Sequence, residues 1–144
     1  MSARLIEALG TTARMAELFS DVSVLKAMLA FEVALAKAEA RIGRIPQSAA
    51  NAIAAAATIE NFDIASLTRE TLRAGTPGIP IARALAAIVD RHDAGAGGFA
   101  HWGVTSQDLV DTSLALLLKR VRGILVDDLV GLESSLENLS EKHP

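Results

Sequence analysis

One histidine and three residues with hydrogen-bonding side chains lie close together before a long apolar run, and they are the strongest candidates for chemistry. They are His101, Thr105, Ser106 and Gln107. The run that follows predicts a helix, so unpaired backbone amides and the positive end of the helix dipole can attract an anion. The hydroxyls and the amide add donors, and His101 can act as a cation or a proton donor. This stretch therefore predicts a binding site for a small carboxylate.

The same stretch also has a purely structural interpretation. Thr105 and Asp108 have the spacing of a capping box, with Asp in place of the usual Glu or Gln. Asp108 adds a negative charge to the first helical turn, which argues against a bare phosphate as the ligand. Capping boxes are common, so the motif by itself favours a capped helix with an incidental His101.

A second candidate lies in residues 75–80, where two glycines and two prolines predict an irregular loop. Loops on a rigid scaffold often carry ligand contacts, which makes Thr76 a candidate for substrate binding. A simple connection between helices is the alternative. Cysteine is absent from the chain and no spacing of His, Asp or Glu fits a metal ion, so we expect no metal site.

The candidate residues depend on a long helix, which we predict from Ser106 to about Ser140. Proline is absent from this run, and its apolar residues recur at steps of three, four and seven. A helix of about 34 residues is roughly 50 Å long. A compact chain of this length has a radius of gyration of only about 14.5 Å. We therefore expect the helix to project from its own chain or to pack on other chains.

The rest of the chain predicts shorter helices and no strand, so the expected fold class is all-α. Ser23 can cap a helix whose buried face we expect to be apolar, with Glu32 and Glu39 off that face. Asp63 can cap another helix. The predicted helices are residues 13–19, 24–41, 47–58, 64–74 and 81–91, with a glycine-rich linker over 93–98.

Composition limits the classes of protein. The 144 residues carry a net charge of -3 with no basic block, so we expect no nucleic-acid partner. The apolar run after Val110 is interrupted by Lys119 and Arg120 too early for a membrane span. Residues 1–10 lack the apolar core of a signal peptide. Together with the absence of cysteine, this predicts a cytoplasmic protein without membrane contact.

Four stretches resemble the fumarase/aspartase superfamily. Residues 101–108, His-Trp-Gly-Val-Thr-Ser-Gln-Asp, are similar to its first signature, His-x-Gly-x-Thr-Ser-x-Asp. Residues 15–21 and 31–40 are similar to its N-terminal helices, and residues 75–81 to a Gly-Asn-x-x-Ile-Pro-Leu loop, with Thr76 where Asn is usual. Within the superfamily, the carboxymuconate cycloisomerase branch is the most similar. Adenylosuccinate lyases are the nearest alternative, although they normally have a His-Asp pair in that loop.

The resemblance implies an architecture. Residues 1–104 would form an N-terminal helical domain, and residues 105–144 would begin a central helical-bundle domain that is truncated here. In this superfamily the long helices of several subunits form the core of a homotetramer, and each active site draws on three subunits. We therefore expect self-association through the long helix.

The resemblance also implies an activity. A small tricarboxylate substrate would undergo intramolecular addition of a carboxylate across a carbon–carbon double bond, without a metal or an organic cofactor. His101 would be catalytic, and Thr105, Ser106, Gln107 and Thr76 would bind substrate. The second and third signatures of the superfamily are missing, so we expect the chain alone to be inactive. A fumarate-releasing lyase and a non-catalytic helical oligomerisation module are the alternatives.

Overall fold

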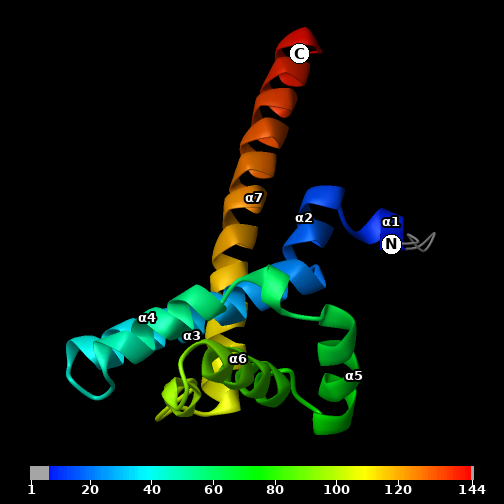
Figure 1. Cartoon of the computed structure of the whole chain (residues 1–144). Coiled ribbons are helices and arrows are strands. Elements are labelled where there is room, and N and C mark those ends of the chain that lie inside the picture. The colour runs from blue at the N-terminus through cyan, green and yellow to red at the C-terminus, as the bar shows by residue number, and fades with distance from the viewer. Residues whose placement is uncertain (1–6, 144) are drawn as a thin grey trace.

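The long helix at the C-terminal end dominates the computed structural model, which describes residues 7–143 (Figure 1). Every regular element in this range is helical, and the range contains no strand, which confirms the all-α prediction. The elements are α1 (Glu7–Gly10), α2 (Ala13–Leu18), α3 (Asp21–Arg41), α4 (Gln47–Ala56), η1 (Ile59–Asn61), α5 (Ile64–Ala74), α6 (Gly78–His92), η2 (Ala96–Phe99) and α7 (Ser106–Lys142).

Two regions discussed from the sequence fall partly outside this range. The predicted lack of a signal peptide rests in part on residues 1–6, and the predicted truncation concerns the end at Pro144. Among the helices that the structure does describe, none combines the length and the apolar character needed to cross a membrane.

Helix α7 confirms the predicted long helix, with 37 residues in one unbroken segment. Its first half packs on α3, α6 and α2, whereas its second half extends beyond the other helices (Figure 1). Three large apolar side chains in the first half are buried, namely Leu109, Leu117 and Ile124. The predicted projection of the helix from its own chain is therefore confirmed.

Helix α3 begins earlier than the sequence suggested. Ser20, not Ser23, is the N-cap, and the Ser20 hydroxyl accepts a hydrogen bond from the Ser23 N–H at 3.2 Å. The Ser23 hydroxyl instead donates to the Glu17 carbonyl oxygen at 2.7 Å. Two serines three residues apart are equally good cap formers, so residue type alone could not choose between them.

Helix α6 also begins earlier than predicted, at Gly78 rather than Ile81. The prediction of an irregular loop through Pro80 was therefore wrong for residues 78–80. Proline is tolerated in the first helical turn, because the N–H that it lacks has no partner there. The true connection is short: Gly75 ends α5 in a left-handed conformation with φ of 70°, and Thr76 and Pro77 follow.

The core lies where α3, α4 and α6 meet the start of α7. Its buried side chains are mostly Ala, Leu, Ile and Val, as the low aromatic content predicts. Helices α3 and α4 lie side by side, because the small side chains of α4, such as Ala49 and Ala50, allow close approach. The glycine-rich linker is also partly ordered as η2, which Asp90 fixes by accepting hydrogen bonds from the Gly95 and Gly97 N–H groups.

Candidate active site

The two loops that the sequence singled out meet at one point. Gly78, in the first turn of α6, packs against Ser106, in the first turn of α7. A methyl group on Gly78 would come within 2.7 Å of the Ser106 Cβ, so only glycine fits there. The Thr76 hydroxyl accepts a hydrogen bond from the Gly78 N–H at 3.3 Å. The N-terminal ends of two helices therefore adjoin, and the dipole of each favours an anion.

The predicted capping box is present. The Thr105 N–H and hydroxyl both donate to Asp108 Oδ2 at 2.8 Å, and the Asp108 N–H returns to the Thr105 hydroxyl at 3.4 Å. These bonds, the backbone one above all, hold the pKa of Asp108 below its ordinary value. Its hydroxyl proton goes to Asp108, so the Thr105 side chain caps α7.

The other residues of this turn have different environments. Ser106 is half-buried beside Gly78, whereas Gln107 is exposed and donates to Asp111 Oδ1 at 2.6 Å. Within residues 7–143 the backbone N–H groups of Ser106 and Gln107 have no acceptor, as expected for the first turn of a helix. These two amides and the Ser106 hydroxyl can therefore donate to a carboxylate.

His101 precedes this turn on a tightly curved loop. Its φ of 57° lies in the left-handed region, which is uncommon outside glycine, and Gly103 repeats the conformation with φ of 74°. Its imidazole Nδ1 lies 2.6 Å from Glu32 Oε1 on α3. The His101 side chain is 16% exposed and that of Glu32 only 1%, so the histidine lies between a buried carboxylate and the surface.

Glu32 is the residue that the sequence interpretation missed. We predicted that Glu32 and Glu39 would lie off the buried face of α3, and the structure shows that both are buried. The missed signal is the spacing, because Leu25, Leu29, Glu32, Ala36 and Glu39 follow one another at steps of four and three residues. That spacing places both glutamates on the same stripe as the leucines.

Burial controls the electrostatics of these two glutamates. It raises the pKa of Glu32 even though the hydrogen bond with His101 lowers it, and it raises the pKa of Glu39 with a further contribution from the Glu32 charge. One carboxylate oxygen of each, Oε2, has no hydrogen-bond partner within the described residues. Buried carboxylates normally have hydrogen-bond partners. Burial of Glu32 and Glu39 next to the candidate site therefore lowers the stability of the fold.

Comparison with known proteins places the chain in a family. The model of a family described as lyase matches residues 7–144. The 3-carboxy-cis,cis-muconate cycloisomerase of Pseudomonas putida is 38% identical over 143 residues, which cover 99% of this chain and 34% of that protein. The enzyme of the same name from Pseudomonas aeruginosa is 40% identical over 140 residues, 97% of this chain and 30% of that protein.

A lyase with another substrate is also similar. The nitrosuccinate lyase of Streptomyces davaonensis is 38% identical over 124 residues, which cover 86% of this chain and 26% of that protein.

A solved structure agrees with these sequence relatives. The 3-carboxy-cis,cis-muconate lactonizing enzyme of Pseudomonas putida superposes with a TM-score of 0.82 at 39% identity, covering 88% of this chain and 29% of that one. The chain spans about a third of the length of the curated relatives. The predicted resemblance is thus confirmed, and the chain belongs to the lyase family that includes these cycloisomerases.

Proposed function

We propose that the whole protein containing this chain interconverts 3-carboxy-cis,cis-muconate and 4-carboxymuconolactone, a step in the breakdown of protocatechuate. The observation that carries this proposal is the similarity to cycloisomerases across 99% and 97% of this chain at 38% and 40% identity. One carboxylate of the substrate adds across a double bond, and a proton is delivered to the carbon beside another carboxylate.

The residues of this chain would bind and orient the substrate. The N–H groups of Ser106 and Gln107 and the Ser106 hydroxyl would hold a substrate carboxylate where the first turns of α6 and α7 adjoin. Thr76 lies in the loop beside them and would complete this site. Thr105 and Asp108 would keep the first turn in place. His101 would present its remaining ring nitrogen, Nε2, to the substrate as an acid, a base or a cation.

The substrate assay separates this function from its main alternative. Since a nitrosuccinate lyase is 38% identical to the chain, a fumarate-type elimination is the second candidate. The whole protein would be assayed with 3-carboxy-cis,cis-muconate, nitrosuccinate and adenylosuccinate. Turnover of the muconate alone supports the proposal, and turnover of either succinate derivative without the muconate would overturn it.

The chain spans about a third of the length of its cycloisomerase relatives, and the remainder of such a protein would supply the other catalytic groups. We therefore propose that residues 1–144 alone have no cycloisomerase activity. Any turnover of the substrate by the purified chain, with the whole enzyme absent, would contradict this.

Helix α7 supports a second part of the proposal, which is self-association. Leu125, Leu129, Leu132, Leu136 and Leu139 are spaced by four and three residues, and about half of each side chain, or more, is exposed. This spacing places them on one face, as in helices that pack against a parallel or antiparallel partner. We propose that a second copy of the chain covers this face, as in a homotetramer. A cytoplasmic location and the division of domains at residue 104 stay predictions.

A further inference from the structure

The hydrogen bond between His101 and Glu32 joins two distant parts of the chain at the candidate site. Glu32 lies in the middle of α3, and His101 lies in the loop before α7. The imidazole Nδ1 of His101 is engaged in this hydrogen bond at 2.6 Å, so only Nε2 remains for a ligand. The fixed partner is Glu32, whose side chain is 1% exposed.

We propose that Glu32 is a positioning residue that holds His101 in the Nδ1–H tautomer and turns Nε2 toward the substrate. This inference rests on the proposed function for its role in turnover. The orientation of the His101 ring is inferred from its hydrogen bond to Glu32 and does not depend on the proposed function. Glu32 touches no substrate in this scheme and acts only through His101.

The backbone at His101 supports the proposal independently. A left-handed conformation at a non-glycine residue persists when surrounding contacts determine it, and such residues cluster at functional sites. The bond to Glu32 is the side-chain contact that anchors His101 in this loop. Helix α3 in turn packs on α7, so the carboxylate and the first turn of α7 keep a fixed relation.

The pairing determines what His101 can do in either protonation state. When the ring is neutral, Nδ1–H donates to Glu32 and Nε2 has a lone pair that can accept a proton from substrate. When the ring is protonated, Nε2–H can donate to a substrate carboxylate, and the Glu32 charge stabilises the imidazolium. Within the described part of the chain, the carboxyl groups of Glu39 and Asp108 interact electrostatically with this pair.

Glutamate-to-methionine substitution tests the positioning role, because Met has nearly the length of Glu but cannot accept this hydrogen bond. Glu39→Met is the matched control, since Glu39 is also buried on α3 and makes no bond to His101. Glu32→Met removes one partner of a buried pair and is expected to lower stability. Glu39→Met removes a buried carboxylate that has no hydrogen-bonded partner within the described residues and is expected to cost less. Thermal unfolding would confirm that both variants fold.

The primary measurement is the ¹⁵N NMR spectrum of the imidazoles at about pH 8.5, where an ordinary histidine is neutral. We expect His101 to be mainly the Nδ1–H tautomer in the original chain and in Glu39→Met. In Glu32→Met we expect loss of that preference in favour of Nε2–H. An Nε2–H tautomer in the original chain, or an unchanged tautomer in Glu32→Met, would overturn the proposal.

Turnover by the whole protein provides the second measurement. We expect Glu32→Met to lower kcat by about 10²-fold, the lower end of what a positioned acid–base group contributes, with a smaller change in KM. A shifted tautomer with unchanged kcat would overturn the catalytic part of the inference. Absence of turnover in the original protein would instead refute the proposed function, while the NMR result would still decide the role of Glu32.

Discussion

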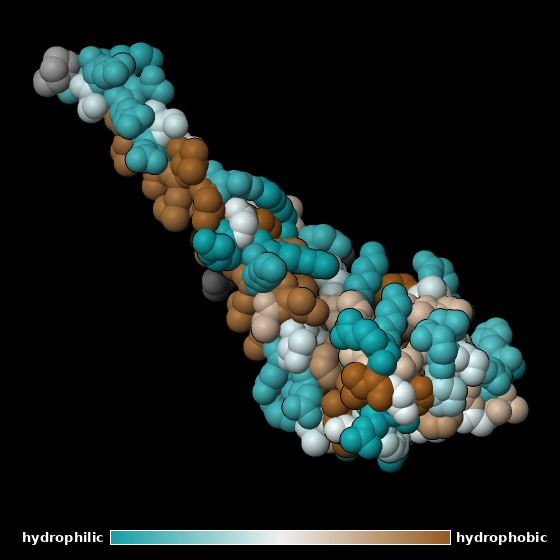
Figure 2. Space-filling model, turned by 90° about the vertical axis from the view of Figure 1, so that its left-hand side faces the viewer, coloured by the Kyte–Doolittle hydropathy of each residue, from teal (hydrophilic) through white to brown (hydrophobic). Residues whose placement is uncertain are grey.

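Both halves of α7 carry many apolar side chains, but only the first half buries some of them. In the first half, Leu109 is fully buried and Leu117 is 3% exposed. In the second half, Leu129 is 63% exposed and Leu132 54%. Figure 2 shows apolar surface continuing along the part of the helix that projects from the other helices.

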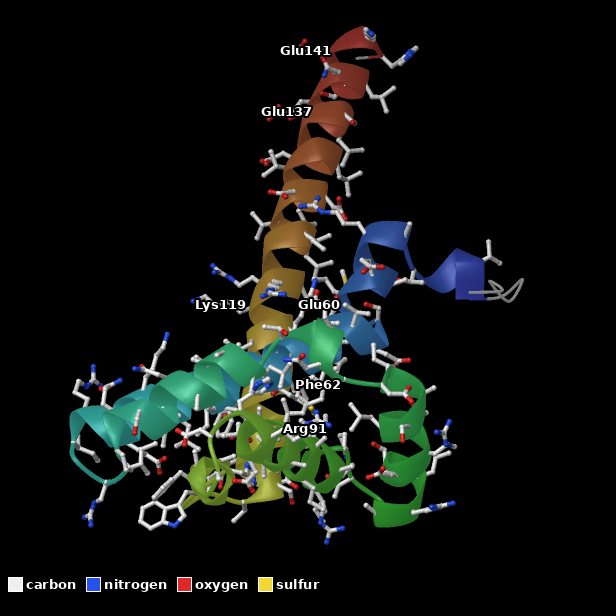
Figure 3. All side chains as sticks on the ribbon, viewed as in Figure 1. Glu60, Phe62, Arg91, Lys119, Glu137 and Glu141 are labelled. Carbon is white, nitrogen blue, oxygen red and sulfur yellow. The ribbon has the colours of Figure 1, made fainter. Side chains whose placement is uncertain are left out.

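The difference shows that tertiary contact, not local sequence, separates a core helix from an unpartnered one. Both halves lie in one continuous helix. Only the first half has α3 and α6 to cover it. The far end of the second half has acidic side chains, Glu137 and Glu141, that project from one side (Figure 3). A helix with one apolar and one charged face favours a partner on the apolar face.

The largest expected difference between the two halves comes from the same leucine-to-alanine substitution made once in each half. Leu109→Ala should destabilise the chain by about 2–5 kcal/mol, because it removes a fully buried side chain and leaves a cavity. Leu132→Ala, in the other half, should change stability by no more than about 0.5 kcal/mol when the chain is dilute. Urea unfolding at low concentration measures both. Equal losses of stability in the two variants would contradict the difference in burial between the two halves.

The next effect concerns the cap that begins the first half. Thr105→Ala removes a hydroxyl that accepts from the Asp108 N–H and donates to the Asp108 carboxylate. We expect a loss of about 1 kcal/mol in the free energy of unfolding. Ser106→Ala is the matched control and should cost less, because the cap bonds remain. A larger cost for the control would contradict the assignment of the cap.

The pH dependence of stability tests the buried glutamate near the start of α7. Burial raises the pKa of Glu39 in the folded chain, so ionisation opposes folding. Stability from this group is therefore present below the pKa of the unfolded chain and is lost as pH rises through the folded value. Glu39→Gln should raise the melting temperature at pH 7 relative to the original chain, and the difference should shrink near pH 4. A constant difference across this range would refute the effect.

The smallest effect concerns the ion pair where the two halves meet. Arg14 on α2 lies 2.9 Å from Asp127 on α7, and both side chains are more than half exposed. Exposed pairs of this kind contribute about 0–1 kcal/mol and are screened by salt. Asp127→Asn should therefore cost little, and the loss should disappear at high salt. Asp128→Asn, one residue along, is the control.

The sequence predicted helices well where the apolar pattern was long, and less well where a single residue determines the start of a helix. The 3.6-residue period and the absence of proline were enough for α7. Ser20 and Ser23 could not be distinguished as caps, since the choice depends on how α2 leads into α3. Pro80 was read as a loop residue because the first turn of α6 could not be located from composition.

The candidate site was harder to predict from the sequence, because its geometry depends on contacts between residues far apart in the chain. The capping box of Thr105 and Asp108 is a local motif and was predicted. The pairing of His101 with Glu32 spans 69 residues and appears only in three dimensions. The close packing of Gly78 on Ser106 is of the same kind. Whether these residues bind substrate stays a prediction.

The second half of α7 has an exposed apolar face, which we propose a second copy of this chain covers. Analytical ultracentrifugation of the 144-residue chain over a wide concentration range tests it most directly. We expect a homo-oligomer that the triple variant Leu129→Gln, Leu132→Gln, Leu136→Gln converts to a monomer. The matched triple variant Glu133→Gln, Glu137→Gln, Glu141→Gln should remain associated. A monomer at every concentration, or a leucine variant that still associates, would refute self-association through this face.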